Sequence, residues 1–279
     1  MSLDAKIEED ILNLINHLNK KEYDLVIINA KKYIERGKNF AIFYSLIGVA
    51  YFFKNQNDKA IAYYNSALNL EPNSEETYRN LGKSLRKKNR LTEAQKAFET
   101  SIELKADNPD GYFNLGLIKL DFGNYYESIK NFKQSIKYNN KFFQAYYNLG
   151  IVHDLIGNLK ESKNYYIQCI NINNKHIKAL NNLATLYINS NNNNEALKLL
   201  NKCIEIEPNY TQALTNIGVV LQDKKNFPDA LFFYEKAIKI DPSFTKAIVQ
   251  KLFIKRKLCD WSDEFEHSKH LKIINNSEE

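Results

Sequence analysis

The chain has 279 residues, of which 44% are hydrophobic and 26% charged, and its formal net charge at pH 7 is +6. No segment approaches the roughly 18 uninterrupted apolar residues that a membrane-spanning helix requires, so we expect no membrane association. The positive charge is modest and dispersed along the sequence, which argues against a nucleic-acid partner.

The first forty residues are predicted to form a degenerate helical unit and cap. The first ten are acidic and lack the basic and apolar regions of a secretory signal peptide, so we expect a cytoplasmic protein. Residues 23–27 match residues 57–61 of the next unit, but Leu14 stands where the later units have a small residue. A divergent end unit is typical of a cap.

A small residue recurs every 34 positions between residues 41 and 244. A fixed period of this size predicts stacked supersecondary units, each packing mainly on its neighbours. The small residue is the eighth of each unit: Gly48, Gly82, Gly116, Gly150, Ala184 and Gly218. The units begin at Ala41, Glu75, Pro109, Phe143, Ile177 and Thr211.

Each unit contains two amphipathic patterns that are typical of α-helices, here called helix A and helix B. Large apolar residues at unit positions 4, 7, 24 and 28, with small ones at 8 and 20, fall on one face of each helix. Glycine inside a helix costs about 1 kcal/mol relative to alanine. Its recurrence therefore predicts that the two helices approach too closely at position 8 for a larger residue.

The break between the helices falls at unit positions 15 and 16. Gly-Asn pairs at residues 123–124 and 157–158 predict a left-handed helix stop followed by an N-cap. Asn55 and Asn89 take the place of the glycine in earlier units. Three prolines at position 32 predict the end of helix B: Pro72, Pro208 and Pro242.

The three cysteines do not form a disulfide framework. Cys169 and Cys203 are 34 residues apart and occupy one slot of the repeat, which predicts small buried packing residues. A reducing compartment agrees with this usage. The same slot holds Ala67, Ser101, Ser135 and Ala237 in other units.

The pattern across residues 41–244 resembles tetratricopeptide repeats at almost every diagnostic position. The resemblance implies an all-α fold, a right-handed αα superhelical solenoid. It implies a degenerate N-terminal repeat or cap at 1–40, six repeats at 41–244, and a C-terminal capping helix and junction segment at 245–279. It also implies that helix A lines a concave groove, with positions 2, 5, 6, 9, 12 and 13 facing a ligand.

No enzyme motif is present in the sequence. The phosphate-binding loop, the zinc-protease pair, the serine-hydrolase elbow and the dinucleotide-binding glycine motif are all missing. His267 and His270 are three residues apart, but no further ligand accompanies them at suitable spacing. We therefore expect no metal, no cofactor and no catalysis by this chain.

Position 6, on the predicted groove face, holds a column of asparagines, although the first repeat has Leu46 there. An amide side chain offers a donor and an acceptor side by side, so it can pair with a peptide unit in both senses. The column predicts a surface that binds an extended protein segment through its backbone. A structural role in bonding between repeats is the alternative. The column comprises Asn80, Asn114, Asn148, Asn182 and Asn216.

The second repeat adds a basic cluster to the same face. Arg79, Lys83 and Arg86 stand at positions 5, 9 and 12, and Lys87, Lys88 and Arg90 follow. Such a cluster can attract an acidic peptide segment, and the alternative is a solvated basic face. The carboxylate clamp of repeats that bind chaperone tails is not met, because position 5 varies from repeat to repeat.

Residues 245–258 predict a seventh helix A, and residues 257–263 contain the only tryptophan. This segment resembles the Cys-Asp-Trp junction of O-linked N-acetylglucosamine transferases and the related SPINDLY group, whose asparagine ladder holds protein substrates. The catalytic domains of that family would follow the junction, whereas this chain ends at Glu279. No nucleotide-sugar site can therefore be assigned here.

Two functions are expected from these patterns. The first is a non-catalytic module that binds an extended protein or peptide segment in the concave groove. The second is the substrate-recognition half of a protein O-glycosyltransferase that lacks its catalytic domain. The oligomeric state stays open between a monomeric adaptor and a self-assembling scaffold.

Overall fold

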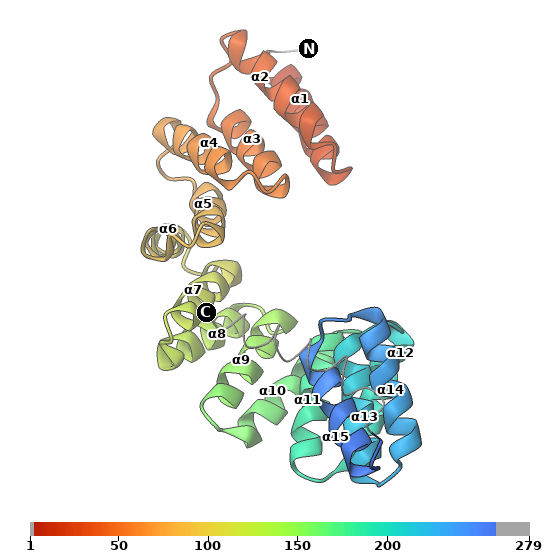
Figure 1. Cartoon of the computed structure of the whole chain (residues 1–279). Helices are drawn as coiled ribbons and strands as arrows, with labels where there is room; N and C mark the ends of the chain where they lie inside the picture. Colours follow the sequence, from red (N-terminus) through yellow and green to blue (C-terminus); the bar gives the residue numbers. More distant parts are fainter. Residues whose placement is uncertain (1–2, 261–279) are drawn as a thin grey trace. The chain divides into compact units, whose positions relative to one another are not determined.

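The computed structural model of the chain describes residues 3–260, and this range contains fifteen α-helices and no strand (Figure 1). The result confirms the predicted all-α solenoid of consecutive helix pairs. None of these helices is long and apolar enough to cross a membrane. The helices are α1 (Leu3–Asn19), α2 (Tyr23–Glu35), α3 (Ala41–Phe53), α4 (Asn57–Leu70), α5 (Glu75–Lys87), α6 (Leu91–Leu104), α7 (Pro109–Asp121), α8 (Tyr125–Tyr138), α9 (Phe143–Leu155), α10 (Leu159–Ile172), α11 (Ile177–Asn189), α12 (Asn193–Ile206), α13 (Thr211–Asp223), α14 (Phe227–Ile240) and α15 (Thr245–Lys257).

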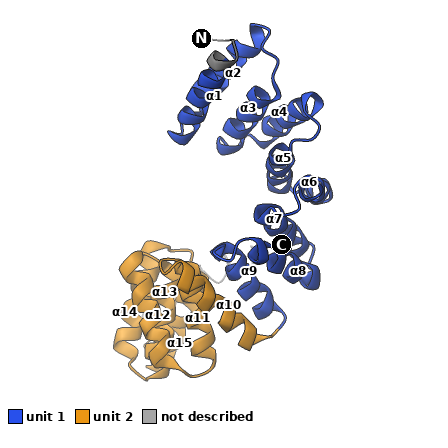
Figure 2. Ribbon diagram, turned by 180° about the vertical axis from the view of Figure 1, so that it is seen from behind, with its two compact units in different colours: residues 1–156 blue, residues 157–279 orange. Residues whose placement is uncertain are grey.

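The helices belong to two compact units, residues 1–156 with α1–α9 and residues 157–279 with α10–α15 (Figure 2). The division falls inside the fourth repeat, between α9 and α10. Within each unit a helix packs against the next helix of the chain, and helix A of one repeat also touches helix A of the next. The predicted segmentation at residues 40 and 244 follows the repeat pattern and stays a prediction.

Every helix A ends in the same left-handed turn. A residue with φ between 55° and 75° follows it at intervals of 34, which confirms the stops predicted at Asn55, Asn89, Gly123 and Gly157. In the second repeat the Asn89 N–H donates to the Arg86 carbonyl and the Arg90 N–H to the Leu85 carbonyl, both at 2.9 Å. The complete series is Lys21, Asn55, Asn89, Gly123, Gly157, Asn191, Lys225 and Cys259.

The N-caps predicted at Asn124 and Asn158 need correction. Both residues stand at the N-cap position of helix B, but neither side chain makes a capping hydrogen bond. The N–H of the first residue of helix B instead donates to the carbonyl of the glycine that precedes each asparagine. These bonds join Tyr125 to Gly123 and Leu159 to Gly157, both at 3.0 Å.

The predicted close approach of helices A and B is confirmed at the glycine slot. A Cβ on Gly82 would lie 2.7 Å from Cε1 of Phe98, whose ring is fully buried on helix B of the same repeat. The small residue at position 20 belongs to the same contact, since the Ser128 hydroxyl donates to the Gly116 carbonyl at 2.9 Å. The fifth repeat has Ala184 opposite Leu200, both fully buried in one core cluster.

The predicted packing role of two cysteines is also confirmed. Cys169 and Cys203 are fully buried free thiols, and burial raises the pKa of each to about 12. Cys259, the left-handed residue after α15, is an exposed free thiol.

Candidate functional site

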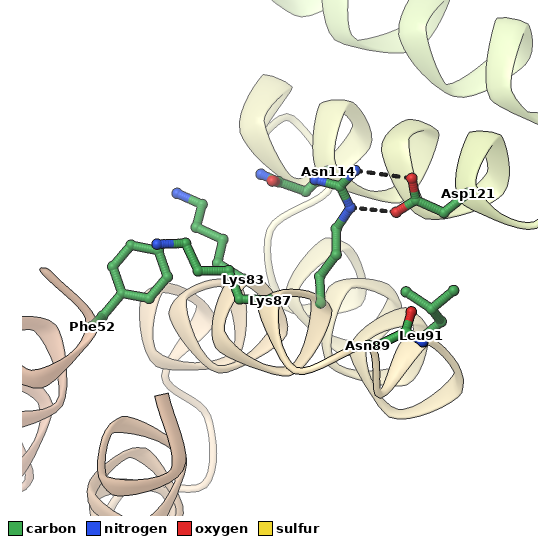
Figure 3. A pocket seen from close by; sticks show the side chains of 8 residues that line it. Phe52, Lys83, Lys87, Asn89, Leu91, Asn114 and Asp121 are labelled. Carbon is green, nitrogen blue, oxygen red and sulfur yellow. Dashed lines mark hydrogen bonds and ion pairs between the residues drawn. The ribbon is translucent and has the colours of Figure 1, made fainter. Parts of the chain in front are cut away.

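A pocket of about 500 Å³ lies on the helix A side of the first unit. Its walls come from α3, α5 and α7, with Asn89 in the turn before α6 and Leu91 at the start of α6 (Figure 3). The volume falls in the range of roughly 300–1,000 Å³ that is usual for ligand sites. The pocket brings together three of the predicted ligand residues, Lys83, Arg86 and Asn114. Its other lining residues are Phe52, Lys87, Asn89, Leu91 and Asp121.

Four basic residues lie on one face of α5, and three of them, Lys83, Arg86 and Lys87, line the pocket. Arg79, Lys83 and Lys87 follow each other at intervals of four, and Arg86 lies three residues after Lys83. Residues three and four apart are neighbours on a helix surface. The helical period therefore places Lys87 on the same side of α5 as Arg79, Lys83 and Arg86, the three cations that the sequence predicted to share a face.

The guanidinium of Arg86 is held by the next repeat. Its Nε donates to one oxygen of Asp121 at 2.5 Å and its Nη2 to the other at 3.0 Å. Such a two-bonded pair fixes the plane of the guanidinium as well as its charge. The pair joins Arg86 of α5 to Asp121 of α7, and dashed lines mark its two bonds at Asp121 in Figure 3. Arg86 thus forms a wall of the pocket and has little charge to offer a ligand.

Arg79 is also neutralised inside the repeat. Its Nε lies 3.2 Å from the Glu75 carboxylate, which also accepts hydrogen bonds from Ser101 and Asn108. Arg79 is not among the residues that line the pocket.

Two further cations of the predicted cluster have carboxylate partners. Lys88 pairs with Asp58 at 2.9 Å, and Arg90 pairs with Glu93 at 2.6 Å. Four of the six cations in the predicted cluster therefore have carboxylate partners. The periodicity of the sequence alone did not reveal these ion pairs.

Lys83 and Lys87 have no carboxylate partner within residues 3–260. The Lys87 ammonium lies 4.1 Å from the centre of the Phe52 ring, a cation–π distance. Lys83 is half-buried, and burial, together with the charge of Arg79, lowers the pKa of its ammonium. Their side chains lie at the end of the pocket next to Phe52 (Figure 3). The positive charge that remains for a ligand is concentrated there.

Three asparagines of the predicted column belong to the first unit. Asn114 is 7% exposed and donates to the Asp110 carbonyl of its own helix at 2.7 Å. Asn148 is half-buried and donates in the same way to the Gln144 carbonyl at 2.8 Å. In both side chains the second N–H of the amide and its Oδ1 form no hydrogen bond within residues 3–260. The half-buried Asn80 side chain forms no hydrogen bond within residues 3–260.

The two asparagines of the second unit differ from each other. Asn182 is half-buried and donates to the Tyr166 hydroxyl at 3.3 Å. Asn216 is only 3% exposed, and its Nδ2 donates to Asn181 at 2.9 Å and to Thr185 at 3.3 Å. Its Oδ1 accepts the Lys246 ammonium at 2.9 Å. The geometry of Asn216 matches the structural alternative, because its amide joins helix A of three successive repeats.

Within residues 3–260, no group of three or more His, Cys, Asp or Glu side chains is placed to hold a metal ion. His267 and His270 lie outside the described residues, as does Trp261 of the junction motif. Cys259 and Asp260, the described part of that motif, form the ordinary turn of the repeat. Their N–H groups donate to the carbonyls of Arg256 and Lys255 at 3.1 and 2.9 Å.

The sequence matches family models described as tetratricopeptide repeat or TPR repeat over most of the chain. The matched segments are residues 48–87, 82–121, 109–142, 143–176, 177–210 and 211–244. A comparison with curated proteins gives no significant match. None of these matches supports the resemblance to O-linked N-acetylglucosamine transferases, which rests on the ladder and the junction motif alone.

Several solved structures share the fold. The APC/C hetero-tetramer Cut9–Hcn1 has a TM-score of 0.70 at 18% identity over 86% of this chain, which spans about half of the matched chain (48%). MamA has a TM-score of 0.53 at 26% identity, over 58% of this chain and 95% of its own. YrrB, described as a TPR protein with an unusual peptide-binding site, has a TM-score of 0.52 at 24% identity, over 66% of this chain and 95% of its own.

Proposed function

The chain belongs to the tetratricopeptide repeat family, a scaffold typical of protein–protein interaction, and we propose that it binds an extended segment of a partner protein. The segment lies along the helix A side of the first unit. The observation that supports this proposal is the pocket of about 500 Å³ to which helix A of three successive repeats contributes. The description of YrrB as a TPR protein with a peptide-binding site agrees with a peptide ligand.

The asparagine amides supply backbone recognition in this proposal. Asn80, Asn114 and Asn148 stand at the same position of successive A helices, and each has at least one N–H and an Oδ1 not used within the described residues. An extended peptide exposes N–H and C=O groups whatever its sequence. Amides in a row can therefore bind it with little regard for its side chains. Asn182 offers the same groups in the second unit, and we leave Asn216 out of the ligand surface.

The charged residues play different parts. Arg86 shapes the pocket wall through its pair with Asp121, and Arg79 stabilises the repeat through Glu75. Of the three predicted cations Arg79, Lys83 and Arg86, only Lys83 has no carboxylate partner within residues 3–260. It therefore meets a ligand with an unpaired charge. The role is one of binding, without a reaction at the site.

The glycosyltransferase alternative gains no support from residues 3–260. Cys259 and Asp260 have the turn geometry found after every helix A, so a local structural role accounts for them. The alternative remains a prediction from the resemblance.

A peptide-display experiment tests the proposed function. Peptides of twelve residues are selected from a random library against the full chain, and their affinity is measured by fluorescence polarisation. The triple variant Asn80→Ala, Asn114→Ala, Asn148→Ala removes hydrogen bonds worth about 0.5–1.5 kcal/mol each. At about 1.4 kcal/mol per tenfold, binding should weaken by about tenfold to a thousandfold.

Asn131→Ala is the matched control. Asn131 is 7% exposed and donates to the carbonyl four residues earlier, like Asn114, but it lies on helix B. It should leave peptide affinity unchanged. Equal affinity of the triple variant and the wild type would contradict the proposed backbone recognition.

A further inference from the structure

A second kind of pocket recurs in the first unit, where helix B of one repeat meets both helices of the next. One copy, of about 340 Å³, lies among α4, α5 and α6. Another, of about 470 Å³, lies 34 residues later among α6, α7 and α8. The two have equivalent linings: Tyr78 corresponds to Tyr112, and Leu81 to Leu115. We call them the lateral pockets. They share no lining residue with the pocket of about 500 Å³ on the helix A side.

In the first repeat a tyrosine of the chain itself fills this place. The Tyr63 ring, on α4, stacks on Tyr51 at 5.5 Å and lies 6.4 Å from the Tyr44 ring. The Lys31 ammonium lies 5.9 Å from its centre. Tyr63 thus sits between helix B of the preceding unit and helix A of its own repeat.

The same surroundings exist one repeat later without the tyrosine. Thirty-four residues after Lys31, Tyr44 and Tyr51 come Asn65, Tyr78 and Leu85, and all three line the lateral pocket of the second repeat. The counterpart of Tyr63 is Ala97, which lines the same pocket. The pocket is therefore the space that an aromatic side chain takes in the first repeat.

The sequence pattern at this position agrees with the pockets. Position 23 is large in four repeats and small or polar in the second and third, the two repeats whose copies form the lateral pockets. The series is Tyr63, Ala97, Asn131, Tyr165, Leu199 and Phe233.

We propose that the lateral pocket beside Ala97 binds a tyrosine side chain of a partner protein, in the place that Tyr63 takes in the first repeat. Ile61, Leu81 and Leu85 line the pocket with apolar groups and Tyr78 with an aromatic ring, and the charged residues Arg90, Glu93 and Lys96 line it as well. The volume of about 340 Å³ exceeds the roughly 150 Å³ of an apolar cavity that binds benzene. The space is therefore large enough for a phenol ring.

The hydroxyl group distinguishes tyrosine from phenylalanine at this site. In the first repeat the Lys31 ammonium lies beside the Tyr63 ring, and the neighbouring Tyr63 hydroxyl raises the pKa of that ammonium. Asn65 stands at the equivalent position, and its amide can donate to a phenol oxygen. The pocket beside Asn131 has Lys119 in place of Leu85 and Glu99 in place of Asn65, and these charged groups make it less suited to a ring.

N-acetyl-L-tyrosinamide serves as the probe, titrated into the full chain while backbone amide shifts are followed by NMR. We expect saturable shifts in α4, α5 and α6, and none with N-acetyl-L-alaninamide. Ala97→Tyr fills the pocket and should weaken this binding about tenfold or more. The variant should stay folded because tyrosine is native at this position in the first repeat. Ala97→Leu is a second variant that fills the pocket, with a smaller side chain than tyrosine. Leucine is the native residue at this position of the fifth repeat, Leu199.

Two controls separate this site from its neighbours. Asn131→Tyr fills the next lateral pocket and should leave the shifts in α4–α6 unchanged. The asparagine triple variant should also bind the probe like the wild type, so this proposal can fail or hold independently of the proposed function. Equal probe affinity of Ala97→Tyr or Ala97→Leu and the wild type would overturn it, as would shifts confined to other helices or no saturable shift.

Discussion

Gly82→Ala is expected to destabilise the second repeat, although alanine is the better helix former. The added Cβ would lie 2.7 Å from Cε1, 2.8 Å from Cζ and 2.9 Å from Cδ1 of Phe98. The ring is fully buried and cannot move away without displacing the core. The substitution therefore forces helices α5 and α6 apart or rotates the ring from its preferred position.

The magnitude follows from two opposed effects. Overpacking of a core costs about 1–3 kcal/mol, and replacing a helical glycine by alanine returns about 1 kcal/mol. The net loss in the free energy of unfolding is about 0–2 kcal/mol. In a Phe98→Leu background the ring is gone, so the same substitution should stabilise by about 1 kcal/mol. The sign of the effect reverses between the two backgrounds.

The fifth repeat contains this combination naturally. Ala184 stands at the glycine position and Leu200 at the ring position, and both are fully buried. The double variant Gly82→Ala, Phe98→Leu reproduces that pair in the second repeat. It should therefore be more stable than Phe98→Leu alone.

Hydrogen exchange of the amides in α5 and α6 is the suitable assay, because repeat arrays need not unfold in one cooperative step. The wild type, Gly82→Ala, Phe98→Leu and the double variant form a double-mutant cycle. Their protection factors give local free energies of unfolding and a coupling energy between the two sites of about 1–3 kcal/mol. An equal loss from Gly82→Ala in both backgrounds would refute the steric explanation.

Two other predictions concern single residues. Lys225 has a φ of 60°, which costs a residue with a side chain about 1 kcal/mol. Lys225→Gly should therefore raise the free energy of unfolding by about 1 kcal/mol in denaturant titration, whereas Lys224→Gly, at a φ of −77°, should not. Because burial raises the pKa of the two core thiols to about 12, an aromatic disulfide reagent at pH 8 should modify only Cys259 in the native protein. Three thiols should react after unfolding, and modification of more than one in the native state would contradict the assigned burial.

The 34-residue period predicted the backbone of the repeats but only part of the site. Helical spacing was enough to place Lys83 and Arg86 on one face, because that depends on geometry within one helix. The pairing of Arg86 with Asp121 depends on a side chain 35 residues away, whose direction a pattern does not contain. The resulting distinction between paired Arg86 and unpaired Lys83 required the structure.

The asparagine column shows the same limit. Asn114 and Asn216 occupy equivalent positions, yet only Asn216 is enclosed by neighbours that use its whole amide. Those neighbours are Asn181 and Lys246, from the preceding and following A helices. Position 6 alone therefore does not decide between a ligand contact and a structural bond, and the residues beside it in adjacent repeats do.

The packing of each helix on its sequence neighbours has a consequence for folding and cooperativity. Extensive contacts join helices of the same or adjacent repeats, so structure can form in any hairpin and spread to the next. Such local contacts favour fast folding, and the outer hairpins can open without the inner ones. A partner segment bound along α3, α5 and α7 would link the first repeat directly to the third. Occupancy would then make these repeats unfold together, so that a ligand changes how cooperatively the array opens as well as how stable it is.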